Sequence, residues 1–192
     1  DYGRYKMKNI SDAKRQLRKI FEKTAVEIRL IGSGGIRGLK TRPKADLLVS
    51  MKNIDDIHAL YPELQKNGYL ILSKDEKTVR LSKKNKKTGH TDFDIYVVSH
   101  KSPEYIQYIS LHHYLIVNAF KRAEYQRFKF AQTSQTDYAV KKKEYLDKLN
   151  KEAYYYYFLG KHIQLSDIEM IEAGDKKIFQ GTTTRMKNPD GL

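Results

Sequence analysis

The sequence contains no cysteine and no long run of apolar residues, and each absence excludes a class of protein. Without cysteine the chain has no disulfide, thiol nucleophile or thiolate metal site, which favours a cytoplasmic location. The longest apolar stretches, "DLLVSM" and "IYVV", are too short to span a bilayer. No basic-then-apolar leader precedes them. Because the chain begins at Asp1 without an initiator Met, we expect either a trimmed chain or a domain of a longer polypeptide.

Acidic residues are scarce relative to basic ones. The 192 residues include 37 Lys and Arg against 23 Asp and Glu, which gives a formal net charge of +14. Such a surface attracts polyanions, so nucleotides, RNA, DNA and acidic membrane are candidate partners. The alternative is that the lysine-rich faces are simply solvated. Charge alone does not choose between these interpretations.

Apolar periodicity predicts a small mixed sheet followed by helices. Ser11 is a candidate N-cap for a helix that continues to Phe21, and residues 53–69 have a second helical pattern. Strands are expected at 26–30, 45–51, 69–73, 77–83 and 91–99. One helix face runs from about residue 102 to Phe120, and another helix is expected over 137–158. This order predicts an α+β protein with flanking helices and a helical C-terminal part.

The stretch "IGSGG", residues 31–35, predicts a sharp turn after the first strand. Glycine allows such a turn to bring backbone N–H groups close to an anion, and the hydroxyl of Ser33 can add a further donor. Asp46 on the next expected strand is spaced so that a divalent metal can bridge its carboxylate and a triphosphate. The alternative is a turn with a purely structural role.

Residues 28–49 resemble the GrpB family, whose members have a nucleotidyltransferase-like fold. The family's run resembles "H-I-G-S-T-(S/A)-V-P-G-L-x-x-K-P-I-I-D-I-x-V", and the matching residues are Ile31, Gly32, Ser33, Gly38, Leu39, Pro43, Asp46 and Val49. Later segments, "GYLIL", "YVVSHKSPEYIQYISLHHYL" and "EYQRFKFAQTSQTDYAVKKKEYL", are also similar, so the resemblance covers roughly residues 26–155. It implies a nucleotidyltransferase-type sheet in a domain of residues 1–160. Residues 161–192 have little pattern and are expected to form a docked or mobile tail.

The chain departs from the family pattern at several polar positions. Leu30 occupies a place where the family often has His, and Arg37 replaces the proline before Gly38. Asp94 and Tyr96 occupy the places of the family's H-x-H. Contacts that relatives build from those positions therefore do not carry over to this chain.

The wider nucleotidyltransferase fold uses a Gly-Ser turn, a D-x-D pair and a third Asp on a later strand. The resemblance therefore implies Asp46 and Asp94 as ligands of Mg²⁺ or Mn²⁺ with a bound NTP, but Leu48 stands where the second carboxylate of the pair is expected. Period-two geometry puts Asp92 on the same strand face as Asp94, so Asp92 is expected to supply a third ligand. The alternative is that Asp92 is a solvated turn residue.

Basic and aromatic residues add candidates for ligand binding. Arg42 and Lys44 precede Asp46 and are expected to neutralise phosphates, unless they belong to a solvated loop. His112 lies on an apolar helix stripe, which indicates a core histidine rather than a ligand. The tyrosines at 154–157 cover all sides of a helix and are expected either to pack against the C-terminal tail or to stack on bases.

Two functions follow from these patterns. The first is a Mg²⁺-dependent nucleotidyltransferase of the GrpB type, which moves a nucleoside monophosphate from an NTP to an unknown acceptor. In this hypothesis Asp46 and Asp94 are catalytic, and the nucleotide is bound by Gly32, Ser33, Arg42 and Lys44. The second is a catalytically silent module that binds a nucleotide, RNA or a partner protein. Leu48 favours the silent module, whereas Asp46 together with Asp94 favours the enzyme.

Overall fold

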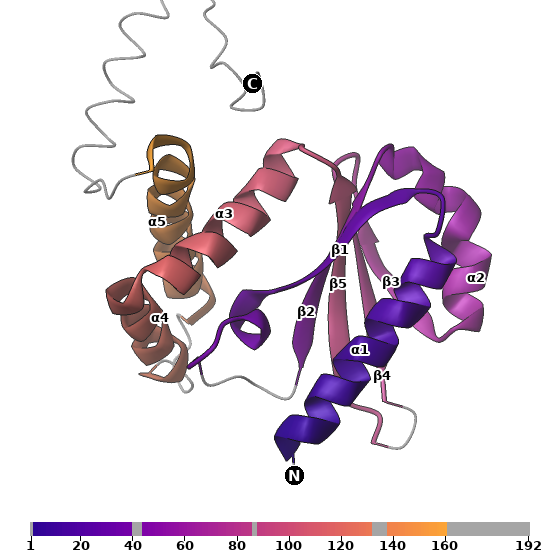
Figure 1. Cartoon of the computed structure of the whole chain (residues 1–192), viewed down its shortest axis with the longest axis horizontal. Helices are drawn as coiled ribbons and strands as arrows, with labels where there is room; N and C mark the ends of the chain where they lie inside the picture. Colours follow the sequence, from indigo (N-terminus) through magenta and orange to yellow (C-terminus); the bar gives the residue numbers. More distant parts are fainter. Residues whose placement is uncertain (1, 40–43, 86–87, 132–137, 161–192) are drawn as a thin grey trace, which may run out of the picture. The chain divides into compact units, whose positions relative to one another are not determined.

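The computed structural model describes residues 2–39, 44–85, 88–131 and 138–160 (Figure 1). The chain divides into two compact units, Asp1–His112 and His113–Leu192. The division falls within a helix that begins at Pro103, next to residue 102, where the sequence suggested that the helical part begins. The expected C-terminal tail, 161–192, lies outside the described residues.

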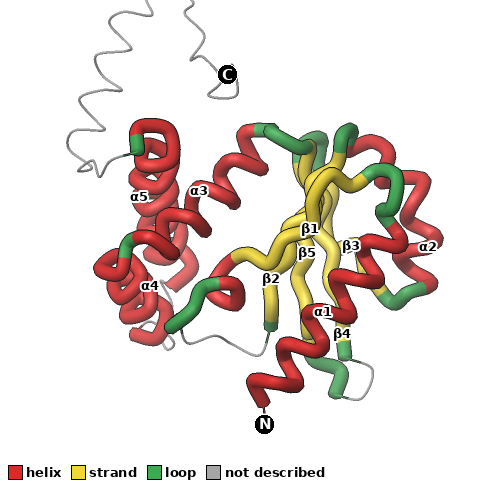
Figure 2. Tube along the Cα trace, in the orientation of Figure 1, coloured by secondary structure: helices red, strands yellow, loops and turns green. Residues whose placement is uncertain are grey.

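A mixed five-stranded sheet forms the centre of the first unit (Figure 2). Its strands are β1 (Ala25–Ile31), β2 (Ala45–Met51), β3 (Tyr69–Lys74), β4 (Thr78–Lys84) and β5 (Thr91–Ser99). They lie in the order β1-β2-β5-β4-β3, in which β2 and β5 are parallel and the other neighbours are antiparallel. The predicted α+β class and mixed sheet are confirmed.

One face of this sheet packs against α1 (Tyr2–Ile20), η2 (Ile54–Leu60) and α2 (Tyr61–Lys66) (Figure 1). Alternate residues of the two central strands, such as Leu47 and Ile95, are buried there together with Leu17 of α1. Burying each such side chain stabilises the fold by about 1.5–3 kcal/mol. The expected helix start at Ser11 is wrong, because the apolar stripe of α1 extends back to the buried Ile10.

The other face of the sheet packs against α3 (Pro103–Val117), which follows β5. A second apolar cluster forms there from residues of β1, β2, β5 and α3, namely Ile31, Leu48, Val98, Tyr105 and Ile109. Asp46 and Asp94 also belong to this face, because side chains alternate along a strand and the neighbours Leu47 and Ile95 point to α1.

The second unit contains the end of α3 together with α4 (Ala119–Ala131) and α5 (Tyr138–Leu159). Glu152 of α5 accepts a hydrogen bond from Tyr114, 3.1 Å away, and one from Lys121, 3.0 Å away. The expected single helix through Phe120 is wrong. Asn118 separates α3 from α4 and accepts a hydrogen bond from the backbone N–H of Lys121, while Phe120 is 74% exposed.

The tyrosines at 154–157 differ from one another in burial. Tyr155 is buried, Tyr157 is exposed, and the ring of Tyr154 lies 4.5 Å from that of Phe158. Within the described residues, none of the helices has the combination of length and apolar character that crossing a membrane requires.

Candidate functional site

Asp46 and Asp94 lie opposite each other at the centre of the sheet. The parallel register of β2 and β5 pairs Asp46 with Asp94 and, two residues later, Leu48 with Tyr96. Paired residues of adjacent strands are about 5 Å apart. The structure therefore brings together the two aspartates that the sequence selected.

The carboxylate of Asp94 is shared by two cations. Its Oδ2 accepts a hydrogen bond from Lys44 Nζ and another from Arg80 Nη2, which is 2.9 Å away. The side chain of Asp94 is 3% exposed, whereas those of Lys44 and Arg80 are 39% and 43% exposed. A buried anion thus anchors two cationic groups that reach the surface. We call these three residues the anion site.

The charges of the anion site are mutually stabilised. Burial raises the pKa of Asp94, but hydrogen bonds from Lys44 and Arg80 and their positive charges outweigh it and hold this pKa below its ordinary value. The hydrogen bond to Asp94 raises the pKa of Arg80 in turn. The ion pair therefore favours the charged forms of both Asp94 and Arg80.

Arg80 is a site residue that sequence reasoning missed. It lies on β4, where the register pairs it with Tyr96, and its guanidinium carbon is 5.7 Å from the centroid of that ring. The ring of Tyr108 from α3 is 5.1 Å from that of Tyr96. Burial and the nearby charge of Asp46 raise the pKa of Tyr96. The anion site thus has an aromatic border beside Asp46.

Gly32 makes a close approach to Asp46 at the beginning of η1 (Gly32–Gly35). Its φ is +62°, and a Cβ atom at this position would lie 2.8 Å from Asp46 Oδ2. Gly35 also has little space for a side chain, because its Cβ would lie 2.7 Å from Cε1 of His112. The two glycines therefore allow the turn to pack against β2 and α3. Ser33, the expected phosphate contact, is only 8% exposed.

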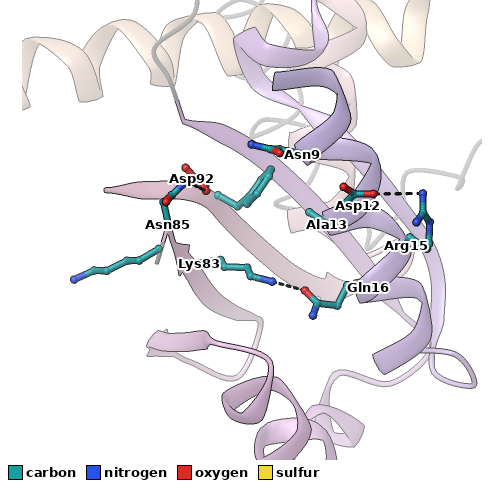
Figure 3. Close-up of a pocket in the computed structure, with 10 residues that line it drawn as sticks. Asn9, Asp12, Ala13, Arg15, Gln16, Lys83, Asn85 and Asp92 are labelled. Carbon is teal, nitrogen blue, oxygen red and sulfur yellow. Dashed lines mark hydrogen bonds and ion pairs between the residues drawn. The ribbon is translucent and has the colours of Figure 1, made fainter. Parts of the chain in front are cut away.

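Asp92 does not join the two other aspartates. The register between β4 and β5 changes from Lys83 paired with Phe93 to Lys84 paired with Thr91, which leaves Asp92 as the extra residue of a β-bulge. Asp92 accepts a hydrogen bond from Asn85, 3.1 Å away, and lines a pocket beside α1 (Figure 3). The expected common face of Asp92 and Asp94 is wrong, because a bulge interrupts the alternation of side chains.

That pocket has a volume of about 480 Å³ and lies between α1 and the ends of β4 and β5. Figure 3 shows two pairs among its polar side chains: Lys83 donates to Gln16, and Arg15 forms an ion pair with Asp12, 3.3 Å away. Sequence patterns did not indicate this pocket, because residues such as Gln16 and Lys83 are 67 positions apart in the chain.

The carboxylates do not fit Mg²⁺ or Mn²⁺ in this arrangement. Asp94 Oδ2 is engaged by two cations, the position after Asp46 on the same face is the apolar Leu48, and Asp92 lies elsewhere. In the part of the chain that the structure describes, no three His, Cys, Asp or Glu side chains are placed to hold a metal. The expected phosphate ligand Arg42 lies outside the described residues.

Comparison with known proteins agrees with this fold. The sequence model of the GrpB protein family matches residues 5–152. The glutamate-rich protein GrpB of Alkalihalophilus pseudofirmus is 26% identical over 149 residues, which cover 71% of this chain and 83% of that protein. The crystal structure of the conserved protein GrpB from Enterococcus faecalis has a TM-score of 0.69 and 19% identity, and the match covers 80% of this chain and 94% of that one.

A more distant match is the Cid1 poly(U) polymerase bound to MgATP, with a TM-score of 0.41 and 19% identity over 60% of this chain and 38% of that chain. At this distance the likeness supports no conclusion about activity. The family match spans most of the chain and agrees with the Gly-Ser turn, Asp46 and the mixed sheet. The chain belongs to the GrpB family and has its nucleotidyltransferase-like fold.

Proposed function

We propose that this GrpB chain is a binding module that takes a nucleotide by its phosphates at the anion site. Of the two functions that the sequence suggests, the silent module has the better geometric support. The supporting observation is that Lys44 and Arg80 meet on one buried carboxylate while both side chains remain partly exposed. This arrangement directs two cations to one place on the surface.

Two anchored cations are suited to phosphate oxygens. Guanidinium and ammonium groups donate short, charge-assisted hydrogen bonds to phosphate, and the guanidinium presents its donors in a fixed plane. Because Asp94 already restricts both side chains, little conformational freedom remains to be lost when a ligand binds. The overall charge of +14 also attracts an anionic ligand from a distance.

A transferase that uses Mg²⁺ or Mn²⁺ with an NTP is the second candidate. The observation in its favour is the pairing of Asp46 with Asp94 across the parallel strands. The pairing of Asp94 with Lys44 and Arg80 argues against it, since a metal would compete with both cations for the same oxygen. Release of pyrophosphate from an NTP by the purified protein with Mg²⁺ or Mn²⁺ would favour the transferase.

Calorimetric titration with ATP, GTP, CTP and UTP tests the binding module. We expect wild-type protein to bind at least one of them, and Arg80→Gln to weaken that binding about tenfold or more, as the loss of a charged hydrogen bond implies. Arg15→Gln is the matched control, because Arg15 pairs with Asp12 on α1 and is exposed. If none of the four nucleotides binds, with or without divalent metal, the proposal is wrong.

A further inference from the structure

We infer that Asp94 is a positioning residue for two anion-binding cations, and that the anion site prefers a nucleotide free of divalent metal to its Mg²⁺ complex. This inference rests on the proposed function and specifies the form of the ligand. It differs from the role that the fold implies for Asp94, which is to hold the metal itself.

The sheet order explains why two cations reach Asp94. The strand β5 lies between β2 and β4, so Asp94 has a neighbouring strand on each side. Lys44 directly precedes β2, and Arg80 lies on β4. Each neighbouring strand therefore contributes one cation to the same carboxylate oxygen, Oδ2. Lys44 and Arg80 together therefore block a metal from approaching Oδ2 of Asp94.

A divalent ion at Asp94 would meet both competition and repulsion. It would have to displace an ammonium and a guanidinium from a carboxylate that is 3% exposed, and these cations would then lie beside the metal. The repulsion between like charges at a few ångströms disfavours that arrangement. Two of the ligands that would offset this cost are missing, because Leu48 is apolar and Asp92 is paired with Asn85.

Chelation also weakens the attraction between the ligand and the site. Mg²⁺ bound to a triphosphate neutralises charge that Lys44 and Arg80 would otherwise contact, and it occupies phosphate oxygens that would accept their hydrogen bonds. A metal-free nucleotide presents more charge and more acceptors to the same two side chains. The anion site therefore supplies the positive charge that a metal supplies in a metal-dependent site.

Calorimetry with ATP in EDTA and in excess Mg²⁺, at equal ionic strength, tests this preference. We expect wild-type protein to bind ATP more tightly in EDTA. Asp94→Asn should weaken binding about tenfold in both buffers, because the two cations lose their anchor. The matched control is Asp92→Asn, the same change on the same strand, which should leave both affinities unchanged. When Mn²⁺ alone is titrated into wild-type protein, the binding heat should be no larger than the heat measured with Asp94→Asn.

Lys44→Gln provides a second variant in case Asp94→Asn impairs folding, because its side chain is 39% exposed. It should weaken ATP binding in EDTA, whereas Lys66→Gln, an exposed lysine on α2, should not. If wild-type protein binds ATP only with Mg²⁺, and Asp94→Asn abolishes that binding, the inference is wrong. The proposed function as a nucleotide-binding module would still hold. Absence of ATP binding in both buffers would overturn the proposed function as well.

Discussion

Arg80 and Asp94 form a diagonal pair across two antiparallel strands, with Nη2 of the arginine 2.9 Å from Oδ2 of the aspartate. The residue directly opposite Asp94 is Ser82, which is small and 3% exposed, while Arg80 is opposite Tyr96. A long side chain can cross to a diagonal neighbour when the residue between them is small. Ser82 thus leaves space for Arg80 to reach the buried carboxylate.

This pair predicts a pH-dependent stability. The pKa of Asp94 in the folded protein lies below its ordinary value of 3.8, so its contribution is complete above about pH 4 and is lost as the pH falls through the lower folded value. We expect Asp94→Asn to lower the free energy of unfolding by about 1–3 kcal/mol at pH 7. Urea denaturation from pH 7 to 3 measures the difference in the free energy of unfolding between wild type and Asp94→Asn. This difference should decrease only below about pH 4. A difference that stays constant down to pH 3 would contradict the ion pairs.

The close approach of Gly32 to Asp46 predicts an unusually large cost for a methyl group. Gly32→Ala should destabilise the protein through its positive φ, by about 1–2 kcal/mol, and further through the contact at 2.8 Å. Gly68→Ala is the control, because its φ is +81° and no atom lies within 4 Å of the added carbon. Adding Asp46→Ala should remove the difference between the two variants in urea denaturation. If Gly32→Ala and Gly68→Ala lower the free energy of unfolding equally while Asp46 is present, the close contact with Asp46 is excluded.

Leu48→Asp would recreate the D-x-D pattern of the wider fold, but the structure predicts destabilisation rather than metal binding. Leu48 is 1% exposed and packs with Ile31, Val98 and Tyr105 beneath α3. A charge there should lower stability by more than about 3 kcal/mol. Thermal unfolding with and without Mg²⁺ should give the same midpoint, as it should for the uncharged control Leu48→Asn. A midpoint raised by Mg²⁺ in Leu48→Asp alone would restore the metal hypothesis.

Two tyrosines with different hydroxyl environments predict opposite results for the same substitution. Tyr105 donates to Glu27 across 2.8 Å, and Glu27 also accepts from Arg29. Removing this hydroxyl in Tyr105→Phe should destabilise the protein by about 1 kcal/mol. The hydroxyl of Tyr61 is buried and finds no partner among the described residues, so Tyr61→Phe should be neutral or stabilising. Similar losses in urea denaturation of both variants would contradict this assignment.

The sequence predicted the strands better than the helix ends. The segments 45–51 and 91–99 were identified with the bounds of β2 and β5, because buried central strands are apolar and are flanked by turn residues. The break at Asn118 was missed, since apolar residues continue at helical spacing through Ala119 and Phe120. The side chain of Asn118 caps the start of α4 with a hydrogen bond, and α3 therefore ends before it. Residue types alone do not reveal that a helix is interrupted at this position.

The candidate site was predicted only in part, for topological reasons. Asp46 and Asp94 were selected because the resemblance to the nucleotidyltransferase fold implies them, and Lys44 because it is a basic residue shortly before Asp46. Arg80 was missed, because its proximity to Asp94 depends on β4 lying beside β5, and strand order is not encoded in a local pattern. Asp92 was misplaced, because the bulge that shifts it depends on how Lys83 and Lys84 pair with β5.

The parallel pairing of β2 with β5 also determines when the anion site can form during folding. Arg80 and Asp94 are 14 positions apart on neighbouring antiparallel strands, whereas Lys44 and Asp94 are 50 positions apart. Loop closure costs more entropy for the longer separation, so we expect Lys44 to join after the β4–β5 pair has formed. A ligand that needs both cations then stabilises a contact that forms late in folding. Such a ligand slows unfolding and leaves the folding rate nearly unchanged.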